Sequence, residues 1–166
     1  LSNVMFLTTA NSIHTIPVPL RDRMEVIEIP GYTNLEKAKI ATDFIIPKQL
    51  RENGLDWADI QFQKNAILSI IRNYTMESGV RNLEREIATI LRKIARKALK
   101  EGYTKKTDEE RKEQPFRTVV TEKGLNNYLG NTRFQENAVA HEAEPGLAYG
   151  LAWTEMGGMV LPVEVS

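Results

Sequence analysis

Apolar positions follow a helical period over the middle of the chain and an alternating or continuous pattern near its two ends. The longest helical pattern spans residues 81–100, where apolar side chains recur at spacings of three and four: Leu83, Ile87, Ile90, Leu91, Ile94 and Ala98. This spacing puts them on one face and predicts a single amphipathic helix. Acidic residues in its first turns and basic residues near its end complement the helix dipole.

Shorter helices are predicted on both sides of that one. Thr33 followed by Glu36 is a capping box. It opens a helix whose apolar side chains we expect to face the core: Leu35, Ala38, Ile40, Ala41 and Phe44. Pro47 suits the first turn of a following short helix, and residues 55–62 are expected to form a connection. Residues 64–74 and a short segment ended by Gly130 complete the helical part.

Strand patterns lie mainly toward the ends of the chain. Residues 4–7 predict a buried strand that ends in a polar loop, and residues 25–29 predict a second short strand. Residues 117–120 predict another. Residues 147–154 and 159–165 alternate like the strands of a hairpin whose turn is formed by residues 155–158. We therefore predict a mainly α fold of about four helices with a short strand pair, flanked by incomplete β segments.

Composition excludes several classes of protein. The chain has 166 residues, no cysteine, and 22 Lys or Arg against 22 Asp or Glu. Disulfides and thiolate metal sites are therefore excluded. No apolar run approaches the roughly 20 residues that span a bilayer, and the first residues do not resemble a signal peptide. The zero net charge hides a local excess, because residues 81–100 hold seven Lys or Arg and two Glu, a net charge of +5.

A self-contained catalytic motif is absent from the sequence. No phosphate-binding GxxxxGK[ST] loop occurs, and His14 and His141 are expected to be loop residues facing solvent. Three features remain. Asn11 follows an expected strand, where an amide can hold a water or a phosphate oxygen, although a turn asparagine is the simpler interpretation. Arg21 and Arg23 follow a proline-fixed turn and could stabilise a phosphoryl group or pair with Asp22.

The third feature is Arg81, which opens the long helix. A cation at a helix N-terminus opposes the dipole at a cost of a few tenths of a kcal/mol. That unfavourable position suggests an anionic partner. Pairing with Glu77 or Glu84 is the alternative interpretation.

Taken in order, these features resemble the Lon family of ATP-dependent proteases, which belong to the AAA+ superfamily. The matching stretches are FLTTANS, IPVPLRDRMEVIEIPGYTNLEK, PKQL, ESGVRNLEREI and GLAWTEMGG. The resemblance covers nearly the whole chain. It implies the end of an AAA+ large α/β core in residues 1–30, the small α-subdomain in residues 31–130, a linker in residues 131–146, and the first β-hairpin of the protease domain in residues 147–166.

The resemblance also implies roles for individual residues. Asn11 matches the sensor-1 position, Arg23 the arginine finger that reaches ATP on a neighbouring subunit, and Arg81 the sensor-2 arginine. Tyr32 and Ile40 fall where the family lines the adenine side of the site. The implied cofactors are ATP or ADP with Mg in the full-length parent, with none bound tightly by this segment, and no other metal site is expected.

The implied activity is ATP-dependent proteolysis by a Ser/Lys pair, directed at misfolded and regulatory proteins. The implied partners are the subunits of a homo-hexameric ring and unfolded protein substrates, in a bacterial cytoplasm and without a membrane. The phosphate loop and the catalytic Ser and Lys of the family are missing from these residues. We therefore expect the polypeptide to be a piece of a longer protein and to be inactive by itself as an ATPase or a protease.

A second hypothesis is a DNA-binding module on the basic face of residues 81–100. Arg92, Arg96 and Lys100 are spaced by four and form one stripe, beside Lys93 and Lys97. Such a stripe can follow phosphates with salt-dependent affinity. A solvated helix face without a partner is the simpler interpretation. A plain structural or substrate-recognition domain is the third hypothesis.

Overall fold

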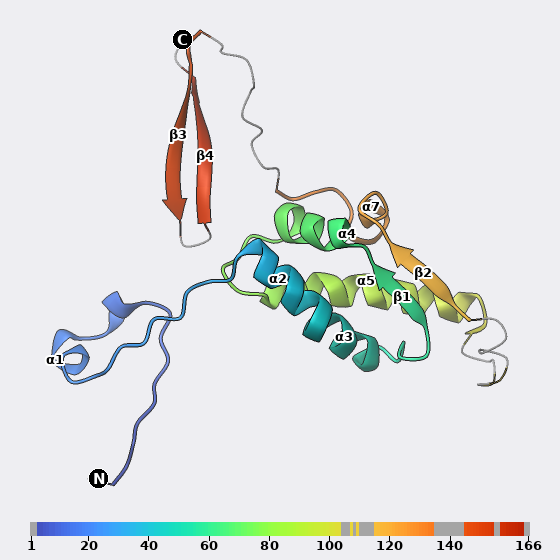
Figure 1. The fold of residues 1–166 in the computed structure, drawn as a ribbon, viewed down its shortest axis with the longest axis horizontal. Helices are drawn as coiled ribbons and strands as arrows, with labels where there is room; N and C mark the ends of the chain where they lie inside the picture. The colour runs from blue at the N-terminus through green and yellow to red at the C-terminus, as the bar shows by residue number, and fades with distance from the viewer. Residues whose placement is uncertain are drawn as a thin grey trace. The chain divides into compact units, whose positions relative to one another are not determined.

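The computed structural model describes residues 3–103, 107, 109, 115–134, 145–154 and 157–164. Contacts divide the chain into two units, Leu1–Pro30 and Gly31–Ser166. Figure 1 shows the elements of both units in sequence order.

The first unit contains two short helical turns, η1 (Ile13–Thr15) and α1 (Val18–Arg21). The strands predicted at residues 4–7 and 25–29 are wrong, because the described residues of this unit form no strand. Phe6 is 71% exposed and Ile27 is 77% exposed. A strand is stabilised by backbone hydrogen bonds to a neighbouring strand. The apolar pattern of residues 4–7 and 25–29 is typical of strands, but residues 3–30 contain no strand with which they could pair.

The second unit begins with a nearly continuous helix made of α2 (Asn34–Ile40), the π-helical turn η2 (Ala41–Ile45) and α3 (Ile46–Glu52). The predicted capping box is confirmed, since Glu36 N–H donates to Thr33 Oγ1 at 3.3 Å and Thr33 N–H donates to Glu36 Oε2 at 2.8 Å. Pro47 lacks an N–H and cannot donate to the preceding turn. The π-helical turn directly before it fits that interruption.

Two side chains on this helix contradict the prediction. Leu35 and Phe44 were expected in the core, but each is 69% exposed. The buried face is instead formed by Ala38, Ala41 and Ile45, together with Lys37. At about 100° per residue, Leu35 and Phe44 lie roughly 90° from the centre of that face. Ile40 is partly buried and packs against the core.

The rest of the helical body packs around the long helix α5 (Arg81–Lys100), whose predicted bounds and buried face are confirmed. Helix α4 (Lys64–Ser69) continues into the π-helical turn η3 (Ile70–Tyr74), and α7 (Leu125–Leu129) follows later in the chain. Figure 1 shows α5 running through the middle of this body, and it contacts α3, α7, η2 and η3. The core is therefore centred on the apolar face of α5.

A short parallel strand pair borders this core. Strand β1 (Asp59–Phe62) pairs with β2 (Arg117–Val120), and the register runs from Asp59 opposite Arg117 to Phe62 opposite Val120. Strand β2 was predicted, but residues 55–62 were expected to be only a connection. Ile60 and Val120 are buried. The mainly α fold with a short strand pair is confirmed.

The last described element is an antiparallel hairpin. Strand β3 (Leu147–Thr154) pairs with β4 (Gly157–Glu164), from Leu147 opposite Glu164 to Thr154 opposite Gly157. Both strands were predicted, but β4 begins at Gly157, so Gly157 and Gly158 belong to the strand and not to the predicted turn. Residues 155 and 156 of the predicted turn lie outside the described residues, as do most of residues 104–114 and of the linker predicted at 131–146. Among the described residues, no helix is both long and apolar enough to cross a membrane.

Candidate functional site

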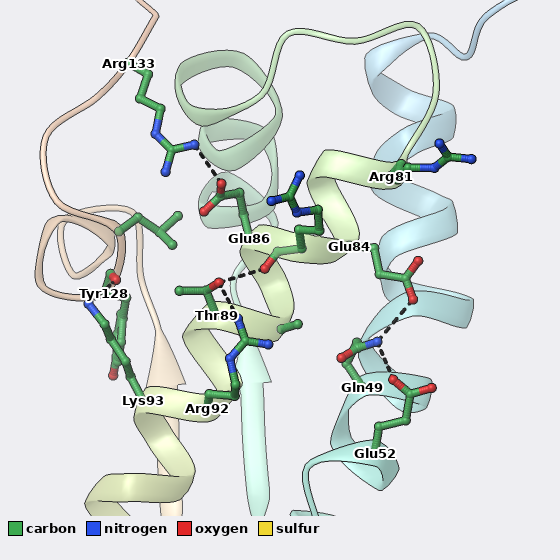
Figure 2. A pocket seen from close by; sticks show the side chains of 13 residues that line it. Gln49, Glu52, Arg81, Glu84, Glu86, Thr89, Arg92, Lys93, Tyr128 and Arg133 are labelled. Atoms are coloured by element: carbon green, nitrogen blue, oxygen red, sulfur yellow. Dashed lines mark hydrogen bonds and ion pairs between the residues drawn. The ribbon is translucent and has the colours of Figure 1, made fainter.

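A groove of about 750 Å³ runs along the solvent side of α5 and is bordered by α3, α7 and Arg133. Figure 2 shows these side chains arranged around the first half of α5. The charged side chains that line the groove are Arg81, Arg85, Arg92, Lys93 and Arg133 on the basic side, and Glu52, Glu84 and Glu86 on the acidic side. The groove therefore mixes charges, and its chemistry depends on which of them are already paired.

Each carboxylate of the groove has a partner. Glu84 Oε1 lies 2.8 Å from Lys48 Nζ and accepts from Gln49 Nε2 at 3.1 Å. The hydrogen bond from Lys48 is the largest cause of a lowered pKa at Glu84. Glu86 Oε1 lies 2.8 Å from Arg133 Nη1, and Glu52 accepts from Gln49 Nε2 at 2.7 Å. The acidic side chains are thus occupied by residues that come from outside α5.

Arg81 is placed differently. It is the first residue of α5 and is exposed. Within the part of the chain that the structure describes, its guanidinium has no ion pair or side-chain hydrogen bond, so the alternative pairing with Glu77 or Glu84 is not observed. Figure 2 shows the side chain extending outward from the first turn of the helix. A free cation at a helix N-terminus is available to an anion that supplies the charge the helix dipole favours.

The start of α5 is fixed by Glu77, which the sequence suggested only as a partner of Arg81, and by Lys37, which the sequence did not single out. Glu77 accepts from Asn82 N–H at 2.9 Å and from Leu83 N–H at 2.8 Å, because Val80 at the N-cap offers no side-chain acceptor. Lys37 Nζ, from α2, donates to the backbone carbonyl of Glu77. Burial lowers the pKa of Lys37, and the charge of Glu77 acts in the opposite direction. Lys37 and Glu77 therefore join α2 to the first turn of α5.

A close backbone approach reinforces this junction. Tyr32 N–H donates to Ser78 O at 2.9 Å. A Cβ on Gly31 would lie 2.9 Å from Ser78 Cβ. Only glycine therefore allows the backbone at residue 31 to come this close to the backbone at Ser78. Tyr32 is therefore hydrogen-bonded to Ser78, which lies three residues before Arg81 in the chain. A lysine and a glycine carry no sequence signal for such a junction, because the contacts are made across 40 or more positions of the chain.

The other predicted site residues are divided between the two units. The structure brings Tyr32 to the segment that precedes Arg81, and it places Ile40 at the end of α2. Asn11 and Arg23 belong to the first unit, where both are exposed. Neither Arg21 nor Arg23 forms an ion pair with Asp22 among the described residues, so that alternative is not observed.

The basic residues predicted for DNA are partly engaged. Arg92 Nη2 donates to Thr89 Oγ1 at 2.8 Å, and Lys93 Nζ donates to Tyr128 O at 2.5 Å. Lys97 Nζ lies 3.9 Å from Glu101 Oε1. Arg96 and Lys100 are exposed. Only Arg92 and Lys93 of this set line the groove.

Two family models match separate parts of the chain. One family model, the Lon protease AAA+ ATPase lid domain, matches residues 51–107, and a second, the Lon protease (S16) C-terminal proteolytic domain, matches residues 119–166. These matches place the chain in the class of proteins that join a helical ATPase lid domain to a protease domain. The chain belongs to the Lon protease family, as its resemblance predicted.

Curated relatives agree over the whole chain. Lon protease of Nitratidesulfovibrio vulgaris is 46% identical over 166 residues, which is 100% of this chain and 19% of that protein. Lon protease of Heliobacterium modesticaldum is 49% identical over 167 residues, again 100% of this chain and 19% of the relative. A solved structure of the Bacillus subtilis Lon protease SSD domain is 41% identical, covering 63% of this chain and 98% of that chain with a TM-score of 0.42. The chain thus spans about a fifth of the length of the curated relatives it matches.

Proposed function

We propose that the helical body is the nucleotide-sensing and force-transmitting α-subdomain of a full-length ATP-dependent Ser/Lys protease. The observation that carries this proposal is the state of Arg81. Among the described residues its guanidinium is exposed and unpaired at the start of α5, while Glu77 and Glu84, its two acidic candidates, bind other groups. A guanidinium in that position fits a phosphate by charge and by hydrogen-bond geometry.

In this proposal Arg81 holds the phosphates from α5 of the same subunit, and Arg23 reaches them from a neighbouring subunit of a homo-hexameric ring. Asn11 orients a water or phosphate oxygen, and Tyr32 and Ile40 line the adenine side. ATP with Mg, when bound, supplies the free energy of its hydrolysis. Because Glu77 and Lys37 fix the first turn of α5, a changed contact at Arg81 moves the helical body as a unit. We place the full-length protein in the bacterial cytoplasm, acting on misfolded and regulatory proteins.

The test is Arg81→Ala in the full-length protein. ATP-dependent degradation of a labelled unfolded protein is expected to fall about tenfold, which corresponds to about 1.4 kcal/mol of coupling. Arg51→Ala is the matched control, since Arg51 is an exposed arginine of α3 outside the groove. Its activity should stay within about twofold of the parent. Unchanged ATP-dependent degradation in Arg81→Ala would count against the proposal.

DNA binding by α5 is a second candidate, favoured by the exposure of Arg96 and Lys100 beside the groove. We predict salt-dependent binding of duplex DNA in gel-shift titrations at low and moderate salt. Removing both charges in Arg96→Ala/Lys100→Ala should flatten the slope of log affinity against log salt by about 0.9 per lost phosphate contact. The result that removes this candidate is an absence of binding at low salt.

A further inference from the structure

The segment that follows α7 lies against the end of the π-helical turn η3. Tyr74 Oη donates to Gly130 O at 3.0 Å, and Gly130 has a φ of 79° that turns the chain after α7. Asn73 O accepts from Arg133 N–H at 2.9 Å and from Phe134 N–H at 3.0 Å. The last carbonyls of a helix have no partner within the helix. Residues 130–134 therefore satisfy the C-terminal end of η3 with backbone groups from 60 positions further along the chain.

The same segment is tied to α5 by an ion pair. Arg133 Nη1 lies 2.8 Å from Glu86 Oε1, and the side chain of Glu86 is only 12% exposed, against 54% for Arg133. Figure 2 shows Arg133 reaching down to Glu86 from outside the helix. A carboxylate with so little exposure loses most of its hydration, and among the described residues its charge-assisted hydrogen bond comes from Arg133. Removing the guanidinium would leave Glu86 without the contact that offsets its burial.

Glu86 and Arg81 belong to the same helix. They are separated by five residues, or about 7.5 Å along the axis at 1.5 Å per residue. Leu83 and Ile87, between and beside them, are fully buried, so this part of α5 is anchored in the core. Beyond Phe134 the chain continues toward β3, within the residues that match the Lon proteolytic domain.

We propose that residues 130–134 form a latch that transmits the position of α5 to the protease part of the protein, and that Arg133 is its positioning residue. The latch consists of the Arg133–Glu86 ion pair together with the bonds to Asn73 and Tyr74. This latch rests on the proposed function and extends it, because a change sensed at Arg81 has to reach the protease part through a physical contact. Glu86, which binds Arg133, is on the same helix as Arg81 and lies about one and a half turns from it.

The first arm of the test is amide hydrogen exchange in the full-length protein. In Glu86→Gln, exchange over residues 130–134 should become at least about fivefold faster, because the ion pair no longer holds the segment on Asn73. Lys48→Ala is the matched control. Lys48 also forms a 2.8 Å ion pair to α5, through Glu84, but it joins α3 and not the latch. Unchanged exchange over 130–134 in Glu86→Gln would overturn the latch.

The second arm separates coupling from folding. Arg133→Ala should lower ATP-dependent degradation of a labelled unfolded protein about fivefold while ATP hydrolysis stays within about twofold. The charge-reversed pair Glu86→Arg/Arg133→Glu should restore degradation to within about twofold, and Lys48→Ala should leave it there. Equal losses in Arg133→Ala and Lys48→Ala, a parallel loss of ATP hydrolysis, or no rescue by the reversed pair would each overturn the proposal.

These arms also distinguish the latch from the sensor on which it depends. If Arg81→Ala uncouples degradation and Arg133→Ala does not, the latch alone fails. If Arg81→Ala has no effect, the proposed function fails, and faster exchange in Glu86→Gln would then describe only a structural contact.

Discussion

Ile90→Asp is expected to unfold the helical body. Ile90 lies in the middle of α5, is 0% exposed, and packs within the central apolar cluster. A carboxylate there loses its hydration without a partner that offsets the loss, which costs several kcal/mol or forces the group to take up a proton. Domains are stable by only about 5–15 kcal/mol. One buried charge is therefore expected to lower the free energy of unfolding by about 4 kcal/mol, which is a large part of the total.

The measurement is urea unfolding followed by helical circular dichroism, with Leu99→Asp as the control. Leu99 belongs to the same helix and undergoes the same chemical change, but it is 59% exposed. Its cost should remain below about 1 kcal/mol, including a small penalty for an acid near the helix C-terminus. Similar unfolding midpoints for the two variants would show that α5 is not the centre of the core.

The contrast between these two positions explains which parts of the fold the sequence could predict. The apolar period of α5 survives in the structure because the helix is long and its partners cover one continuous face. The strand β1 was missed because its four residues gain their stability from β2, which lies more than 50 positions away. The π-helical turns η2 and η3 leave no local pattern, since each depends on how the flanking helices pack.

The first 30 residues of the chain show the opposite error. Val4, Met5, Phe6 and Leu7 have strong strand propensity, yet they are exposed. Propensity describes how well a residue fits a sheet that already exists, and it does not supply the neighbouring strand. The hairpin β3–β4 was predicted correctly because both of its strands are local and pair with each other.

The candidate site was predictable only in part. Arg81 was singled out from the sequence because a cation at a helix N-terminus is unusual and because the surrounding motif resembles the Lon family. Lys37 was not found, since lysines are rarely buried and an isolated lysine in a helix suggests a surface residue. The latch at Arg133 was equally invisible, because its partners Asn73 and Glu86 become neighbours only when the helices pack.

Lys37→Ala is the second change with a large expected effect. Lys37 is only 6% exposed, and its Nζ donates to the carbonyl that precedes α5. Truncation removes buried methylene groups and leaves Glu77 O without this donor, at an expected cost of about 2–3 kcal/mol. Lys39→Ala is the matched control, because Lys39 is an exposed lysine of the same helix. It should change the free energy of unfolding by less than about 0.5 kcal/mol.

Lys37→Met isolates the charge from the packing, because methionine keeps most of the buried stem. Burial lowers the pKa of Lys37, so the folded protein releases this proton at a lower pH than the unfolded chain does. Between the lowered pKa and the ordinary lysine value the unfolded state binds more protons, and stability rises with pH. The parent should therefore gain stability relative to Lys37→Met as the pH is raised toward about 10. A stability difference that stays constant or shrinks in urea titrations over this alkaline range would show that Lys37 is not held in a desolvated position. In that case the junction between α2 and α5 would depend on Glu77 and Gly31 alone.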